Sequence, residues 1–271
     1  MVAGPNGSGK STLIAGLRAD PTLDLPTLYI NADDLQRERR LADAREAQHL
    51  ATRLRAEALA AKADVMYETV MSHPAKLAEL QSAKAAGYHI TVHLVATDDP
   101  AINEQRVGAR VKAGGHPVAP EVIRARYART LALAPMAIAY ADQAVVFDNT
   151  RGGDTGGGLA LQAALQDGRL AALADPLAGW VHSLVMQVNA RAAAMASLAR
   201  DGVQLASLGQ GLTTGPIVSI GPHYVVQLDA ASNARVVHDG ILLGSAVAGW
   251  AVHQVHRIGY REGVAEIDPA R

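Results

Sequence analysis

The first dozen residues hold the pattern with the most specific chemistry in this chain. Gly4 to Thr12 reads Gly-Pro-Asn-Gly-Ser-Gly-Lys-Ser-Thr, the G-x-x-x-x-G-K-S pattern of a phosphate-binding loop. Its glycines allow backbone N–H groups to turn inward around a phosphate, and the positive end of the following helix points at the same anion. Lys10 is expected to reach the β- and γ-phosphates, and the Ser11 hydroxyl to ligate Mg²⁺. The residues expected to cradle the nucleotide are Gly4, Pro5, Asn6, Gly7, Ser8, Gly9, Lys10, Ser11 and Thr12.

Acidic side chains follow the next two predicted strands. Asp33 and Asp34 come directly after the buried strand 28–30, and Glu68 lies near the end of the strand 64–70. Open α/β sheets bind ligands at the carboxyl ends of their strands, and phosphoryl transfer needs a base that orients the acceptor hydroxyl. We expect one aspartate to cap a helix and the other, Asp33, to be that base. Glu68 either holds a sugar or ribose hydroxyl, or holds Mg²⁺ through water; the alternative is a solvated residue at a strand end.

A pair of arginines predicts a lid over the phosphates. Arg106 and Arg110 are four residues apart on a predicted helix, and a Gly-Gly-His sequence follows them. Guanidinium groups that close over a γ-phosphate stabilise the charge of the transition state, and the glycines would let the loop move. The alternative is an exposed helix face with salt bridges. Arg124 and Arg126 are weaker candidates for the lid.

Composition excludes several classes of function. The 271 residues carry a formal net charge of −1, so no global field favours nucleic acid or an anionic membrane surface. The absence of cysteine excludes disulfides and zinc–thiolate sites and agrees with a cytoplasmic location. No apolar run is long enough to span a bilayer, and no signal peptide is apparent. These observations predict a soluble globular enzyme or switch.

Hydrophobic patterning divides the chain into four parts. Residues 1–150 alternate short strands with helices, which predicts a parallel sheet with helices on both faces, as in P-loop kinases. Within this part, 36–62 reads as one long helix with a solvated arginine face, and only three residues precede the phosphate loop, so its leading strand is nearly missing. The other expected parts are a Gly-rich linker over 151–158, a helical segment over 159–206, and a small β-rich module with a mobile tail over 207–271.

Several blocks together resemble one protein family. The ordered set GPNGSGKST, NADD, YETVMSH, the stretch from Arg106 to Val118, RARYART and FDN resembles the zeta-toxin family of P-loop kinases, in particular its short bacterial branch of predicted ATPases. The resemblance covers about residues 1–150. Residues 215–243 faintly resemble the small KfrB-type modules of plasmid proteins.

The zeta-toxin resemblance implies an activity and roles for residues. Family members phosphorylate UDP-N-acetylglucosamine or related UDP-sugars on a sugar hydroxyl, using ATP and Mg²⁺. It implies Asp33 as the base, lid arginines on the phosphates, and sugar contacts from Glu68 and Thr69. We also expect Asp34 to bind the substrate. Arg110 matches one lid arginine, while Arg106, Arg124 and Arg126 compete for the second position. The expected catalytic residues are therefore Asp33, Lys10 and Arg110.

Two functions remain open from the sequence. The first is a kinase acting on a small nucleotide-sugar, with a separate antitoxin as a possible partner. The second is an ATP-binding or ATPase switch that controls a partner through the C-terminal module. A kinase needs a base that faces an acceptor pocket, whereas a switch needs only Mg²⁺ and a moving loop.

Overall fold

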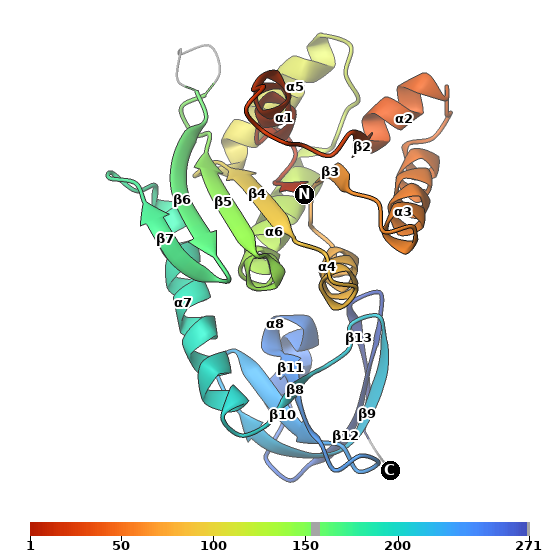
Figure 1. The fold of residues 1–271 in the computed structure, drawn as a ribbon, viewed down its shortest axis with the longest axis vertical. Coiled ribbons are helices and arrows are strands. Elements are labelled where there is room, and N and C mark those ends of the chain that lie inside the picture. The colour runs from red at the N-terminus through yellow and green to blue at the C-terminus, as the bar shows by residue number, and fades with distance from the viewer. Residues whose placement is uncertain (153–157, 270–271) are drawn as a thin grey trace.

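The computed structural model describes residues 1–152 and 158–269, which form two β-sheets joined by a long helix (Figure 1). Among these residues the first sheet has the strand order β2-β3-β1-β4-β5-β6-β7, and the second has the order β13-β12-β9-β10-β11-β8. The strands of the first sheet are β1 (Val2–Ala3), β2 (Leu28–Ile30), β3 (Val65–Thr69), β4 (Thr91–Ala96), β5 (Gln143–Asp148), β6 (Ala160–Gln166) and β7 (Arg169–Leu173).

β1 is the middle one of the five parallel strands of the first sheet although it has only two residues. Val2 pairs in parallel with Glu68 of β3 on one side and with His93 of β4 on the other. Val2 and Ala3 are fully buried, so two residues are enough because neighbours cover both edges and both faces. The order of the strands reverses at β1, and such a switch point opens a crevice at the carboxyl ends of the strands. The phosphate loop leaves β1 at this crevice.

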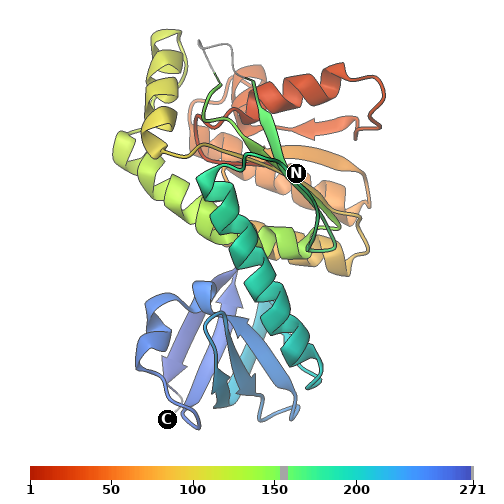
Figure 2. The same cartoon turned by 90° about the vertical axis from the view of Figure 1, so that its left-hand side faces the viewer.

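Helices cover both faces of the five parallel strands, as predicted. Adjacent residues of β4 show the two faces: Val95 packs with Leu13 of one helix, whereas Leu94 belongs to the cluster of Leu80 and Ile138 on the other side. In Figure 2 the long helix α6 crosses the first sheet on the side that faces the second sheet. The helices are α1 (Lys10–Ala19), α2 (Ala32–Glu38), α3 (Ala44–Ala60), α4 (Ala75–Ala85), α5 (Pro100–Lys112) and α6 (Pro120–Tyr140).

The prediction of a single helix over residues 36–62 is wrong. The chain forms α2 and α3 instead, and Asp43 caps α3 through its carboxylate, which accepts from the N–H of Arg45. The arginine face is only partly solvated, because Arg55 is buried. Its guanidinium pairs with Glu79 of α4 at 3.2 Å and lies over the ring of Tyr67. Arg55 therefore packs α3 against the domain rather than facing water.

The prediction of a helical segment over 159–206 is wrong for residues 159–173, since these form the hairpin β6–β7. β6 pairs antiparallel with β5, so the first sheet continues beyond residue 150. Asp167 and Gly168 make the turn with φ of 49° and 69°, which fits a two-residue hairpin. The expected linker falls mostly on 153–157, which lie outside the described residues.

A second sheet follows the long helix α7 (Gly179–Ala199). The β-rich character expected for residues 207–271 is confirmed, since they contain β9, β10 and β11 of this sheet. The expected mobile tail is wrong for 255–269, which form an antiparallel hairpin on the edge of this sheet; residues 270–271 lie outside the description. The remaining elements are β8 (Gln204–Leu205), β9 (Gln210–Ile220), β10 (Tyr224–Leu228), β11 (Arg235–Asp239), α8 (Gly240–Leu243), a 3₁₀ turn (Gly244–Gly249), β12 (Val255–Arg261) and β13 (Val264–Pro269).

One apolar cluster joins the two sheets. Leu80 of α4, Val181 of α7 and Ile258 of β12 belong to the same buried group. The indole N–H of Trp180 also donates to Asp148 Oδ1 at 2.8 Å, which fixes the start of α7 to the end of β5. None of the helices in the described ranges is long and apolar enough to cross a lipid bilayer.

Candidate active site

The phosphate loop joins the short central strand to α1. Gly9 caps α1 with φ of 102°, in the left-handed region, and a side chain there would collide with the amide of Asn149. No side chain of the described residues caps α1, and its first turn contains no acidic residue. The first N–H groups of the helix are therefore open to an anion, which the helix dipole also favours.

Lys10 and Ser11 meet Glu68 at the start of this helix. The Lys10 ammonium donates to the carbonyl of Pro5 at 3.0 Å and lies 3.6 Å from Glu68 Oε1. The Ser11 hydroxyl donates to Glu68 Oε2 at 3.1 Å. Burial lowers the pKa of Lys10, and the negative charges of Glu68 and Asp33 oppose that shift. The loop lysine, its hydroxyl and a strand-end carboxylate thus form one charged cluster.

Asn31 is a functional residue that the sequence reasoning missed. Its side-chain oxygen accepts from the N–H groups of Asp33 and Asp34 at 2.8 and 3.3 Å, so Asn31 caps α2 and neither aspartate does. Its amide nitrogen donates to Glu68 Oε2 at 3.1 Å. Asn31, two positions before Asp33, was a possible cap, because asparagine is among the best N-cap residues.

The two aspartates have different surroundings. Asp33 is exposed and lines the cleft that contains the phosphate loop. Asp34 does not line that cleft; it pairs with the exposed Arg37 at 2.6 Å. Asp33 is therefore able to contact a ligand in the cleft, whereas Asp34 faces Arg37 on the exposed side of α2.

The arginines predicted to form a lid also differ in their contacts and in whether they line the cleft. Arg106 Nη2 donates to the carbonyl of Asn149 at 2.8 Å and also to that of Gly152. Arg110 is exposed at the cleft and contacts the carbonyl of His116 at 3.4 Å, while Arg124 is paired with Glu104 at 2.6 Å outside the cleft. The candidates that line the cleft are Arg106, Arg110 and Arg126.

Asn149 supports the loop from the end of β5. Its amide nitrogen donates to the carbonyl of Ser8 at 2.8 Å, and the side chain is buried. Arg126 Nη1 approaches Asn6 Oδ1 at 3.3 Å from α6. The signal for Asn149 in the sequence was its position directly after a predicted strand, where ligand-binding residues gather.

A single cleft of about 1330 Å³ brings most of the predicted site together. Gly4, Pro5, Ser8 and Asp34 do not line it, although the first three shape the loop. Its far end is formed by α3, the start of α4 and α6, including Thr52, Arg55 and Arg129. The predicted residues that line the cleft are Asn6, Gly7, Gly9, Lys10, Ser11, Thr12, Asp33, Glu68, Thr69, Arg106 and Arg110.

The cleft carries an excess of positive charge along its whole length. Its lining contains two carboxylates, those of Asp33 and Glu68. It also contains seven lysines and arginines, of which Arg55 and Lys76 are paired with Glu79: Lys10, Arg55, Lys76, Arg106, Arg110, Arg126 and Arg129. Such a field attracts polyanionic ligands at both ends.

An unpaired donor near the loop fits a bound nucleotide. Arg106 lines the cleft, and its Nη1 is buried without a hydrogen-bond partner among the described residues; Ser8 Oγ also has none there, but Ser8 does not line the cleft. Burial also lowers the pKa of Arg106. A buried donor without a partner costs free energy, and a phosphate oxygen would supply one. Together with the uncapped start of α1, the Arg106 donor fits a nucleoside triphosphate, and Ser11 would supply a hydroxyl ligand to its Mg²⁺.

Comparison with known proteins identifies the family. The family model described as "Zeta toxin" matches residues 1–150, which is more than half of the chain. The chain belongs to the zeta-toxin family. This family is a group of P-loop kinase-like phosphotransferases that bind a nucleotide. All residues that line the cleft up to Asn149 lie within the matched part of the chain.

One relative in sequence and one similar solved structure of this zeta-toxin family member are also found. A protein of Haemophilus influenzae described as "Uncharacterized protein" is 29% identical over 124 residues, which are 46% of this chain and 88% of that one. A solved structure from the characterisation of the PezAT chromosomal toxin-antitoxin system of the human pathogen Streptococcus pneumoniae is 14% identical. It covers 69% of this chain and 76% of that chain with a TM-score of 0.42, which is too distant to inform the site.

Proposed function

We propose that this protein transfers the γ-phosphoryl group of ATP to a sugar hydroxyl of a UDP-sugar such as UDP-N-acetylglucosamine. The observation that carries the proposal is the placement of Lys10, Ser11 and the exposed Asp33 in one continuous cleft. The cleft has cations at both ends, which suits two ligands that each carry phosphates. ATP would occupy the loop end, and the diphosphate of the acceptor would lie toward α3 and α6.

The residues divide the chemistry between them. Asp33 accepts the proton of the acceptor hydroxyl, whose oxygen attacks the γ-phosphorus while the bond to the bridging oxygen breaks and ADP leaves. Lys10, the N–H groups at the start of α1 and the guanidinium groups of Arg106 and Arg110 hold the phosphates as charge develops. Mg²⁺, when bound beside Ser11, neutralises phosphate charge.

Glu68 and Thr69 are proposed to position the acceptor. Glu68 also contacts Lys10 and Ser11 directly, at 3.6 and 3.1 Å. A carboxylate beside the Ser11 hydroxyl would be able to orient a water ligand of Mg²⁺ as well as a hydroxyl of the acceptor. The proposal assigns both tasks to Glu68 because its two oxygens face different partners.

A switch that hydrolyses ATP without an acceptor is the second candidate. The specific observation in its favour is that α4 lines the cleft and also packs against the second sheet.

If the protein is a kinase, we propose a separate antitoxin as its protein partner. The likeness of residues 215–243 to KfrB-type modules stays a prediction.

Mass spectrometry of the reaction products separates these functions. The protein is incubated with ATP, Mg²⁺ and a panel of UDP-sugars, and Lys10→Ala serves as the control. The kinase proposal expects one UDP-sugar to gain the mass of a phosphate, and the control to show no gain. ADP release that is lost in Lys10→Ala, without a phosphorylated sugar, would reject the UDP-sugar and favour the switch. If wild type and control release no ADP above background, both proposals are wrong.

A further inference from the structure

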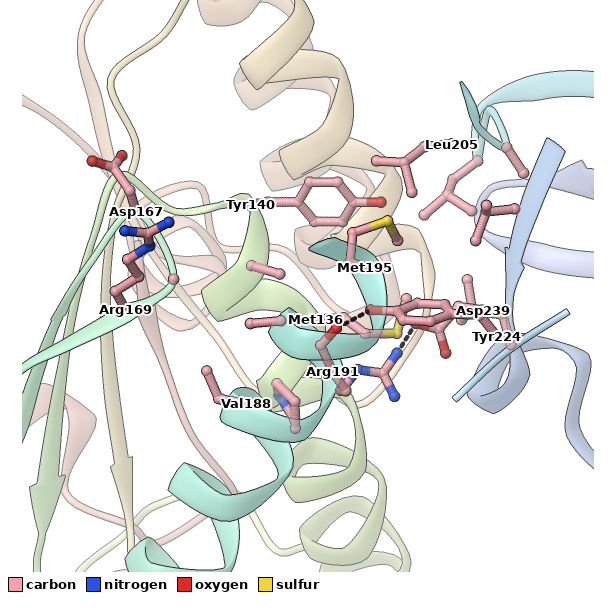
Figure 3. A pocket seen from close by; sticks show the side chains of 18 residues that line it. Met136, Tyr140, Asp167, Arg169, Val188, Arg191, Met195, Leu205, Tyr224 and Asp239 are labelled. Carbon is pink, nitrogen blue, oxygen red and sulfur yellow. Dashed lines mark hydrogen bonds and ion pairs between the residues drawn. The ribbon is translucent and has the colours of Figure 1, made fainter. Parts of the chain in front are cut away.

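A second cavity, of about 340 Å³, lies between the two sheets and shares no lining residue with the phosphate cleft (Figure 3). We refer to it as the junction cavity. It is bounded by the end of α6, the β6–β7 turn, the middle of α7, β8 and the face of β10 and β11. Segments far apart in the chain therefore meet around one space, and its volume lies at the lower end of the range of about 300–1,000 Å³ for small-molecule sites.

The walls of the junction cavity are mostly apolar. The lining includes Met136 of α6, Met195 of α7, the ring of Tyr140 and Leu205, which Figure 3 labels. Methionine thioethers adapt their shape and make favourable contacts with aromatic rings. Leu205 is 55% exposed although it lines the cavity, so its apolar surface gains from a bound ligand.

A buried ion pair forms the polar wall. Arg191 and Asp239 are paired, and their side chains are only 6% and 11% exposed. The Arg191 guanidinium also lies 5.2 Å from the centre of the Tyr224 ring, and the Tyr224 hydroxyl donates to the Arg191 carbonyl at 3.5 Å. The pair offers guanidinium N–H donors beside a carboxylate acceptor, so it presents a hydrogen-bonding edge in an apolar space.

The formal charges of the lining residues cancel. Besides the Arg191–Asp239 pair, the charged residues that line the cavity are Asp167 and Arg169, which lie apart from the others in Figure 3. A ligand with a net charge would enter an apolar space without an unpaired counter-charge, which is costly. A neutral ligand avoids this cost. The phosphate cleft, with its excess of cations, selects the opposite chemistry.

We propose that the junction cavity is a binding site for a neutral, ring-containing small molecule with a hydrogen-bonding edge. The ring would pack between the methionines and Tyr140, and the polar edge would face Arg191 and Asp239. The cavity is too small for a helix or strand of a protein partner, which favours a small molecule as the occupant. The site is independent of the phosphate cleft, so it does not rest on the proposed activity.

The test compares two probes with the same aromatic skeleton. N-phenyl-1-naphthylamine is neutral and has one N–H donor, whereas 1-anilinonaphthalene-8-sulfonate carries an additional negative charge. Both fluoresce more strongly in apolar surroundings, so each is titrated with the full-length protein. We expect saturable binding of the neutral probe and at least about tenfold weaker binding of the sulfonate, because the cavity offers no unpaired cation.

Matched variants locate the binding. Ala192 lines the cavity and is exposed, whereas Ala193 is exposed one residue further along α7 and does not line it. Ala192→Trp should fill the space and weaken the neutral probe by about tenfold or more, and Ala193→Trp should not. A second pair uses two leucines of similar exposure: Leu205→Glu should weaken binding, and Leu212→Glu, at 53% exposure outside the cavity, should not.

The outcomes decide each part of the proposal. Melting temperatures of the variants are measured, so that a variant that fails to fold is set aside and the other pair decides. Absence of saturable binding to the wild type overturns the site. Equal binding by the wild type and by a folded cavity variant places the probe elsewhere and also overturns it. Sulfonate binding that is as tight as that of the neutral probe, and that Ala192→Trp or Leu205→Glu weakens, overturns the neutral-ligand assignment, whereas sulfonate bound at the cationic phosphate cleft is not affected by these variants.

Discussion

Gly263 lies against the backbone of Pro74, and this contact joins the second sheet to a wall of the phosphate cleft. Gly263 is buried in the turn between β12 and β13, and a side chain there would overlap the carbonyl oxygen of Pro74, which lines the cleft. Further along α4, the Gln81 amide donates to the carbonyl of Ala206 at 2.9 Å and accepts from the N–H of Leu208 at 2.7 Å. The second sheet is therefore fixed to the helix that begins at the cleft.

Gly263→Ala should weaken this contact. Gly263 has φ of 75°, so alanine is strained there, and its Cβ must also displace the Pro74 backbone. We expect the free energy of unfolding to fall by about 2–4 kcal/mol, measured by urea denaturation. Gly202→Ala is the control, because Gly202 has φ of 69° with open space around it and should cost about 1 kcal/mol. Equal losses would show that backbone strain alone accounts for the effect.

Asp33→Asn should lower kcat by about 100-fold or more while ATP affinity stays close to that of the wild type. The substitution keeps the shape of the side chain and removes the proton acceptor. Asp34→Asn is the matched control, because Asp34 pairs with the exposed Arg37 and does not line the cleft. Steady-state kinetics and an ATP titration measure the two effects separately. Wild-type turnover in Asp33→Asn would reject Asp33 as the base.

Arg106→Gln should reduce kcat/KM for ATP by about tenfold to 100-fold. It removes the buried, unpartnered Nη1 donor and the contact of Nη2 with the Asn149 carbonyl. Arg124→Gln on the neighbouring helix should leave kcat/KM unchanged, because Arg124 is exposed and paired with Glu104 outside the cleft. If both variants lost activity equally, the division of the arginines between cleft and surface would be wrong.

The sequence predicted the parallel part of the first sheet because its motifs depend on local chemistry. The phosphate loop requires its glycines and lysine at fixed spacing, and the strand-end position of Glu68 follows from the neighbouring apolar run. Which arginines reach the cleft could not be predicted, because Arg124 and Arg126 differ by only two positions on α6 and point to different partners. That distinction depends on how α5 and α6 pack.

The hairpin β6–β7 shows why helix propensity alone gave the wrong secondary structure for residues 159–173. Residues 159–166 are rich in leucine, alanine and glutamine, which favour helix, but pairing with β5 overrides that preference. The Asp167–Gly168 pair was the overlooked signal, since Asp-Gly between apolar runs is typical of a tight hairpin. Glu262–Gly263 makes a turn of the same geometry between β12 and β13, with φ of 49° and 75°, although only its glycine matches that signal.

A buried histidine, His238, should make the stability of the second sheet depend on pH. His238 is fully buried, with its ring nitrogens 3.1 Å from the Tyr260 hydroxyl and 3.1 Å from Gln227 Oε1. The Gln227 amide nitrogen already donates to the carbonyls of Gly215 and His256, so its oxygen must accept from His238 Nε2–H. Nδ1 then accepts from Tyr260, and the neutral ring satisfies both bonds. Burial lowers the pKa of His238 to about 4.

The protein should therefore lose stability as the pH falls below about 6.5. Between about pH 6.5 and pH 4 the unfolded chain binds a proton that native His238 does not, so acid favours unfolding, by about 3 kcal/mol in full. Urea denaturation at pH 7 and pH 5 measures the slope, and His238→Gln should reduce it without abolishing it, because burial also lowers the pKa of His93 to about 4. The exposed His182 on α7 provides the control variant His182→Gln, which should keep the wild-type slope. A slope unchanged in His238→Gln would show that His238 is not held neutral by its burial.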